Sequence, residues 1–113
     1  MEVIEINAEN VRVQMRKGIL EYCILQILAH RDEYPSSLLA ALKGADMIVV
    51  EGTIYPLLIR LKNQGLLTYR WEESTQGPPR KYYSITEKGR AQLREMDAAW
   101  DEMVGAISKL RNS

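Results

Sequence analysis

The chain has 113 residues, 46% of them hydrophobic, which is enough for one small domain with a modest core. Its single cysteine, Cys23, excludes an intrachain disulfide, and no apolar run approaches the roughly 20 residues that cross a membrane. The acidic start, MEVIEINAEN, lacks the basic and then apolar pattern of a signal peptide. We therefore expect a cytoplasmic protein without a membrane partner.

Charge is unevenly distributed along the chain, although 15 basic and 15 acidic residues give a net charge of zero. Residues 53–94 contain eight basic and three acidic residues, so this segment carries +5 and the remainder −5. Such asymmetry favours an anionic partner on one face of the protein. The alternative is that charges such as Lys88 and Arg90 only solvate helix surfaces.

The first predicted helix covers about residues 8–30, where apolar side chains recur at spacings of three and four. Asn7 and Asn10 are candidate N-caps. Gly18 is unfavourable in a helix interior, so it predicts a break between two segments.

A second, short helix is predicted to begin at Pro35 and to end near Gly44, the expected residue beyond the C-terminus. The β-branched run after it, residues 47–50, indicates a small strand or an extended connector.

The third predicted helix follows Val50 and ends at about Gln64, with Gly65 as the residue beyond its C-terminus. Its buried stripe consists of Ile54, Leu57, Leu58 and Leu61. Because proline is tolerated only in the first turn of a helix, Pro56 predicts a start close to Thr53.

A hairpin should follow, because residues 67–71 and 80–85 have the aromatic and β-branched content of strands. Residues 72–79 between them predict a long polar turn. Tyr82 and Tyr83 are adjacent in a strand, so one should pack inward and the other should face outward.

The last predicted helix starts after the N-cap Thr86 and continues to about Leu110. Its apolar residues follow an alternating three–four spacing, the pattern of a helix that packs lengthwise on another helix. This stripe consists of Leu93, Met96, Trp100, Met103, Ile107 and Leu110. It predicts a homodimer interface, and packing on the first helix of the same chain is the alternative.

Nothing in the sequence favours catalysis or a metal site. His30 is the only histidine, and Cys23 lies in an apolar helical stripe, where a structural thiol is expected. No cluster has the spacing of metal ligands and no glycine-rich loop is suited to phosphate. We expect a protein that is not an enzyme and that needs no cofactor.

The predicted order is helix, short helix, helix, hairpin, helix. This describes a mostly α protein with a small β-hairpin, in which a winged helix-turn-helix occupies residues 1–86 and a dimerisation helix occupies residues 87–113. A helix followed by a basic hairpin can place one element in a DNA groove and another on the adjacent backbone.

The residues themselves resemble the PadR family of bacterial transcriptional regulators. The similarity is carried by Gly52-Thr53-Ile54-Tyr55-Pro56 and by the segment GPPRKYYSITEKG at residues 77–89. It extends more weakly over the terminal helices, and the single C-terminal helix resembles the short subfamily. Ser36-Ser37 departs from the Gly-Tyr pair that members often carry at the start of the second helix.

Side-chain chemistry and this resemblance together predict the DNA-binding residues. Thr53 and Tyr55 lie near a helix N-terminus that favours phosphates, although Tyr55 could equally be half-buried packing. Arg80 and Lys81 at the hairpin are expected to bind phosphate, whereas Arg60 and Lys62 are either phosphate ligands or solvated charges. The full set is Ser36, Ser37, Gly52, Thr53, Tyr55, Pro56, Arg60, Lys62, Gly77, Arg80, Lys81 and Tyr82.

Trp100 suggests a ligand site. In multidrug-sensing relatives, a tryptophan at the matching position stacks on flat aromatic ligands at the dimer centre, and the resemblance implies the same here. The candidate lining is Met15, Tyr22, Met96, Ala99, Trp100 and Met103. Asp101 could attract a cationic ligand, and the alternative is that Trp100 and the methionines only pack in the stripe.

The sequence thus predicts a homodimeric repressor that binds a palindromic operator, with its recognition helices roughly 34 Å apart. A small aromatic or cationic ligand would release the DNA by changing the angle between the subunits. The alternative is a winged-helix module that binds another protein and neither DNA nor a ligand.

Overall fold

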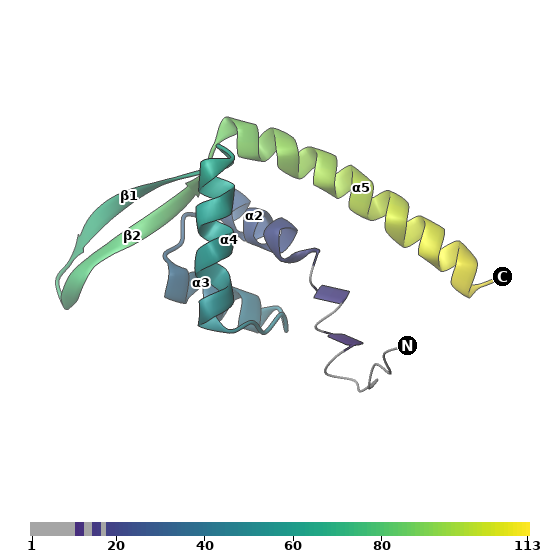
Figure 1. The fold of residues 1–113 in the computed structure, drawn as a ribbon, viewed down its shortest axis with the longest axis horizontal. Coiled ribbons are helices and arrows are strands. Elements are labelled where there is room, and N and C mark those ends of the chain that lie inside the picture. The colour runs from purple at the N-terminus through teal and green to yellow at the C-terminus, as the bar shows by residue number, and fades with distance from the viewer. Residues whose placement is uncertain (1–10, 13–14, 17) are drawn as a thin grey trace, which may run out of the picture.

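The computed structural model describes residues 11–12, 15–16 and 18–113. In chain order its elements are α2 (Leu20–His30), α3 (Pro35–Gly44), α4 (Glu51–Asn63), β1 (Leu67–Ser74), β2 (Gly77–Ile85) and α5 (Glu87–Arg111). Helices α2 to α4 form the body, the hairpin projects from one side of it, and α5 extends away on the other side (Figure 1). The predicted winged helix-turn-helix with a long C-terminal helix is confirmed.

The core lies where α2, α3 and α4 meet. Eight side chains are at most 1% exposed there: Ile24, Leu25, Leu28, Leu38, Leu42, Ile54, Leu58 and Leu61. Burial of each contributes about 2 kcal/mol to folding, because each removes a whole aliphatic side chain from water. Leu66, Leu67, Tyr83 and Leu93 extend this core toward the hairpin and α5.

The break predicted at Gly18 is confirmed, because Gly18 and Ile19 form a turn and α2 begins at Leu20. The candidate caps Asn7 and Asn10 lie outside the described residues. The end predicted for α3 was wrong in its detail. Gly44 is still helical, and Asp46 has the left-handed backbone (φ 61°) that closes the helix. Aspartate tolerates this conformation better than most residues.

Residues 47–50 form an extended connector outside any strand. Helix α4 then begins at Glu51, directly after Val50 as predicted and two residues before Thr53. Pro56 therefore lies beyond the first turn, and its missing N–H leaves one helical hydrogen bond unmade. The end of α4 is as predicted. Gly65 has φ 78°, its N–H donates to the Lys62 carbonyl at 3.0 Å, and Leu66 N–H donates to the Leu61 carbonyl at 3.0 Å.

The long turn predicted over residues 72–79 was wrong. The strands continue to Ser74 and Gly77, and Thr75 and Gln76 alone connect them. The pairing is irregular between Glu72 and Ser74, and this irregularity lies opposite Pro78 and Pro79. A local bulge accommodates prolines in a strand because they cannot donate a ladder hydrogen bond.

A third segment supports the base of the hairpin. Glu33, in the connection between α2 and α3, forms an antiparallel bridge with Tyr83 of β2. Tyr83 N–H donates to the Glu33 carbonyl at 2.8 Å, and Glu33 N–H donates back to the Tyr83 carbonyl at 3.3 Å. The hairpin is therefore fixed to the helical body at its base.

The first turn of α5 docks on the turn between α4 and β1. The predicted N-cap Thr86 is confirmed, because its hydroxyl accepts from Gly89 N–H at 3.0 Å and donates to the Gly65 carbonyl at 2.7 Å. A Cβ atom on Gly89 would lie 2.2 Å from the Leu66 carbonyl oxygen. Glycine is therefore required at this position. Within the described residues, no helix is long and apolar enough to cross a membrane.

Candidate nucleic-acid interface

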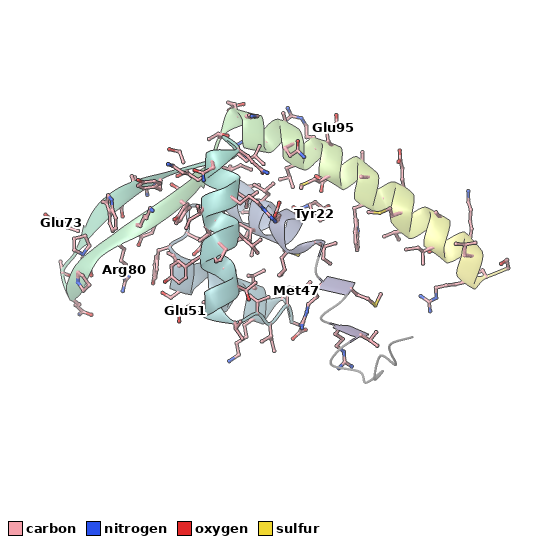
Figure 2. All side chains as sticks on the ribbon, in the orientation of Figure 1. Tyr22, Met47, Glu51, Glu73, Arg80 and Glu95 are labelled. Atoms are coloured by element: carbon pink, nitrogen blue, oxygen red, sulfur yellow. The ribbon has the colours of Figure 1, made fainter. Side chains whose placement is uncertain are left out.

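A cleft of about 430 Å³ lies between α4 and the hairpin, and the N-terminus of α3 borders it. It is lined by Tyr34, Pro35, Ser36, Glu51, Tyr55, Ile59, Trp71, Arg80, Lys81 and Tyr83. In Figure 2, Glu51 at the N-terminal end of α4 and Arg80 on the hairpin lie on the side of the molecule away from the free end of α5. The cleft therefore lies between the third predicted helix, which is the expected recognition helix, and the predicted basic hairpin.

Aromatic rings hold the basic side chains of the wing. The Arg80 guanidinium lies 4.4 Å from the centre of the Tyr34 ring, and the Tyr34 ring meets the edge of Tyr82 at 5.2 Å. On the same strand face, Arg70 lies 5.2 Å from the Tyr82 ring and pairs with Asp32 at 2.6 Å. This carboxylate raises the pKa of Arg70. The wing is thus joined to the loop before α3 through stacked rings and cations.

Lys81 faces the other side of the hairpin. Its Nζ lies 3.9 Å from the centre of the Tyr69 ring, 5.4 Å from that of Tyr83 and 5.9 Å from that of Trp71. Its side chain is half-buried in this aromatic group, whereas Arg80 is exposed. The inward and outward tyrosines are confirmed, because Tyr83 is 4% exposed and Tyr82 lies on the opposite face with Tyr34.

The predicted contact residues of α4 lie on different faces of the helix. Tyr55 lines the cleft and donates its hydroxyl to Glu51 Oε1 at 3.3 Å, and Lys62 Nζ lies 5.5 Å from the Tyr69 ring. Thr53 and Arg60 instead line a second cleft next to the start of α2. There the Arg60 guanidinium forms an ion pair with Glu21.

The remaining predicted DNA-binding residues differ in whether they are exposed and free to contact DNA. Gly52 and Pro56 are exposed on α4, and Gly77 is exposed at the end of the hairpin. Ser36 is exposed and lines the cleft. The hydroxyl of Ser37 instead caps the start of α3. It accepts from Tyr34 N–H at 3.0 Å and donates to the Tyr34 carbonyl at 2.9 Å.

Two of the predicted ligand residues, Tyr22 and Trp100, meet where α2 and α5 are in contact. The rings of Tyr22 and Trp100 lie 6.1 Å apart at 41°, and Met96 is half-buried beside the core. Ala99, Met103 and Met15 are exposed, Met15 to 73%. The structure therefore brings Tyr22 and Trp100 together, and Met96 lies one helical turn before Trp100 on α5.

Sequence reasoning missed a polar cluster beside this contact. Tyr22 donates its hydroxyl to Asp97, and Gln26 Nε2 donates to Asp97 Oδ1 at 2.6 Å. The hydrogen bond to Asp97, followed by burial, raises the pKa of Tyr22. The spacing of Tyr22 and Gln26 was a signal for this cluster, because residues four positions apart lie on the same face of a helix.

The apolar stripe of α5 is only partly covered. Leu93 is buried in the core and Met96 is half-buried against it. Beyond them the stripe is exposed: Trp100 39%, Met103 51%, Ile107 55% and Leu110 74%.

The described residues contain no group of three or more histidine, cysteine or acidic side chains that could hold a metal ion. Burial raises the pKa of the Cys23 thiol, which disfavours the reactive thiolate.

A helix-turn-helix body with a basic hairpin beside its third helix is a winged helix-turn-helix domain. The chain is similar to a PadR-like transcription factor from Bacteroides fragilis, with 54% identity, 89% of this chain and 98% of that one covered, and a TM-score of 0.76. A PadR-like regulator from Bacillus cereus is 39% identical over 88% of this chain and 98% of its own, with a TM-score of 0.78. A PadR family regulator from Eggerthella lenta is 32% identical over 90% of this chain and 89% of its own, with a TM-score of 0.83.

The pattern of the PadR-like transcriptional regulator family matches residues 24–95. The chain belongs to this family, and it is a DNA-binding transcriptional regulator that is not an enzyme.

Proposed function

We propose that the protein is a homodimeric repressor that binds a palindromic operator and releases it when a small aromatic ligand binds. The observation that carries this proposal is the exposed stripe of α5 from Trp100 to Leu110. A row of apolar side chains at heptad spacing on a single helix is stabilised by a second helix. A second copy of α5 would cover it, so residues 87–113 act as the dimerisation element and residues 1–86 as the DNA-binding unit.

In such a dimer each cleft between α4 and the hairpin would receive one half-site. Gly52 has no side chain and is exposed in the first turn of α4, which allows close approach of the backbone to DNA. Arg80 is the exposed cation best placed for phosphate, and Ser36 at the N-terminus of α3 adds a donor. Arg60 and Ser37 contribute less to DNA than the sequence suggested, because Glu21 and Tyr34 already occupy them.

The ligand would bind between the two copies of Trp100, next to Tyr22 and Met96. Trp100 is 39% exposed on one protomer, so part of its ring is available to a flat molecule. A bound molecule would change how α5 packs on α2, and therefore the distance between the two recognition helices. Asp101 on the same helix would favour a cationic ligand.

The DNA-binding function is tested by selecting bound duplexes from a random pool and then titrating the selected duplex at several salt concentrations. A binder that neutralises several phosphates loses affinity steeply as salt rises. Recovery of a two-fold symmetric sequence is the expected result. Failure to enrich any sequence, with salt-independent binding, would favour the alternative of a winged-helix module that binds a protein.

Ligand release is tested by titrating flat aromatic cations while recording tryptophan fluorescence. Trp71 is 64% exposed on the hairpin and would add its own signal, so Trp71→Phe serves as the background variant. Quenching should occur in this background, where Trp100 is the one tryptophan left in the chain. Isothermal titration calorimetry of the same ligand then compares Trp71→Phe with Trp100→Ala, and the alanine variant should bind more weakly. Equal affinities of these two variants would remove Trp100 from the ligand site.

A further inference from the structure

Glu51 is an acidic side chain in a cleft where an acid is unexpected. It is the only carboxylate among the residues that line the cleft between α4 and the hairpin, which also contains Arg80 and Lys81. The proposed DNA would bring phosphates to this cleft, and a carboxylate there repels them. Glu51 therefore lowers affinity for DNA unless it finds a donor on the nucleic acid.

No cation among the residues that the structure describes pairs with Glu51. Within the described residues its carboxylate forms no ion pair, and the hydroxyl of Tyr55, at 3.3 Å from Oε1, is its one hydrogen-bond partner. Both neighbouring cations are directed elsewhere, Arg80 onto Tyr34 and Lys81 onto Tyr69. A carboxylate can accept about four hydrogen bonds, so most of the acceptor capacity of Glu51 is free.

The position of Glu51 suits contact with a base. It is exposed in the first turn of α4, the helix that enters the major groove in a winged helix-turn-helix. Tyr55, one turn further along, fixes the carboxylate from one side through Oε1. In the major groove, the amino group N4 of cytosine is the donor that glutamate typically recognises.

We propose that Glu51 recognises a cytosine in each half-site by accepting a hydrogen bond from its N4 amino group. Glu51 is then a specificity determinant: it weakens binding to sequences without this amino group and permits binding where the amino group is present. The inference rests on the proposed operator binding and assigns one of its sequence-dependent contacts.

Glu51 also stabilises the N-terminus of α4, and a test must distinguish this effect from base recognition. Val50, the N-cap of α4, provides no side-chain cap, and an acid in the first turn stabilises a helix through its dipole. Glu51→Gln is the informative variant, because it keeps the size of the side chain and still accepts a hydrogen bond. A glutamine favours adenine, to which it can both donate and accept.

The test compares base preferences, obtained by selection from random duplexes, for the wild type, Glu51→Gln, Glu51→Ala and the control Glu73→Gln. Glu73 is an exposed carboxylate near the end of the hairpin, so its replacement removes the same charge away from α4 (Figure 2). We expect the wild type and the control to prefer cytosine at one position of each half-site by roughly tenfold or more. Glu51→Gln should prefer adenine there, and Glu51→Ala should show no preference.

Unchanged base preferences in both Glu51 variants, with only a lower melting temperature, would overturn the inference and leave the helix role alone. In that case the wild type would still select an operator, so the proposed function would stand. If the wild type enriched no duplex at all, the proposed function and this inference would both fail.

Discussion

The guanidinium of Arg80 lies 4.4 Å from the centre of the Tyr34 ring, so the wing and the loop before α3 are in direct contact. This contact holds a flexible basic side chain above one border of the cleft before any DNA arrives. A preorganised cation loses less conformational entropy when it binds a phosphate.

Replacing Tyr34 by leucine should lower affinity for the operator about two- to fivefold, because an exposed cation–π contact contributes about 0.5 to 1 kcal/mol. Tyr34→Phe keeps the ring and should bind as the wild type does. A fluorescence anisotropy titration measures both values. Equal affinities of the leucine and phenylalanine variants would show that the ring does not position Arg80.

The hydrogen bonds from Tyr22 and Gln26 to Asp97 should fix α5 on α2. Asp97→Ala leaves both donors without their partner and should lower the free energy of unfolding by about 1 kcal/mol, since the site is partly open to water. Glu95→Ala is the control, because Glu95 is exposed and points away from α2 (Figure 2). Urea denaturation at one protein concentration measures the difference, and equal midpoints for the two variants would contradict the assignment.

Gly89 and Gly105 both lie in α5 and should respond to alanine in opposite directions. Gly89→Ala forces a methyl group against the Leu66 carbonyl and should destabilise the protein by about 1 to 3 kcal/mol. A Cβ on Gly105 meets nothing within 4 Å, so Gly105→Ala should stabilise by up to about 1 kcal/mol through helix propensity. Thermal unfolding measures both, and a stabilising Gly89→Ala would show that α5 docks differently.

The elements with strong local signals could be predicted from the sequence. The apolar spacing of α4, the left-handed glycine at residue 65 and the cap at Thr86 each depend on neighbouring residues only, and all three are confirmed. The hairpin turn was predicted too long because Pro78 and Pro79 suggested a loop. The bulge opposite them, which tolerates proline, is a property of the paired strand.

Contacts between distant segments could not be predicted. The residues next to Arg60 in the sequence do not indicate that it forms an ion pair with Glu21. Asp32 likewise lies in a loop without periodicity, and yet it pairs with Arg70 of β1. The same holds for Tyr34, which is 46 positions from Arg80 in the numbering of the chain. The chemistry of the site was therefore predictable at the level of residue types, whereas the residues that position it required the structure.

The proposed dimer predicts that a charge in the exposed stripe of α5 separates the subunits. Ile107→Glu would place a carboxylate in an apolar helix contact, and the protein should then sediment as a monomer. Ala98→Glu adds the same charge at an exposed position outside the stripe and should remain dimeric. Analytical ultracentrifugation distinguishes these states. A wild type that is monomeric at all concentrations would contradict the dimer.

The salt dependence of operator binding tests the central claim, that the cleft between α4 and the hairpin binds DNA, most directly. The slope of log affinity against log salt should be less steep by about 0.9 per phosphate contact removed, so Arg80→Ala should reduce it measurably. The double variant Arg80→Ala, Lys81→Ala should reduce it further, and Lys109→Ala, a cation near the end of α5, should leave it unchanged. An unchanged slope in the double variant, with wild-type affinity, would contradict DNA binding through this cleft.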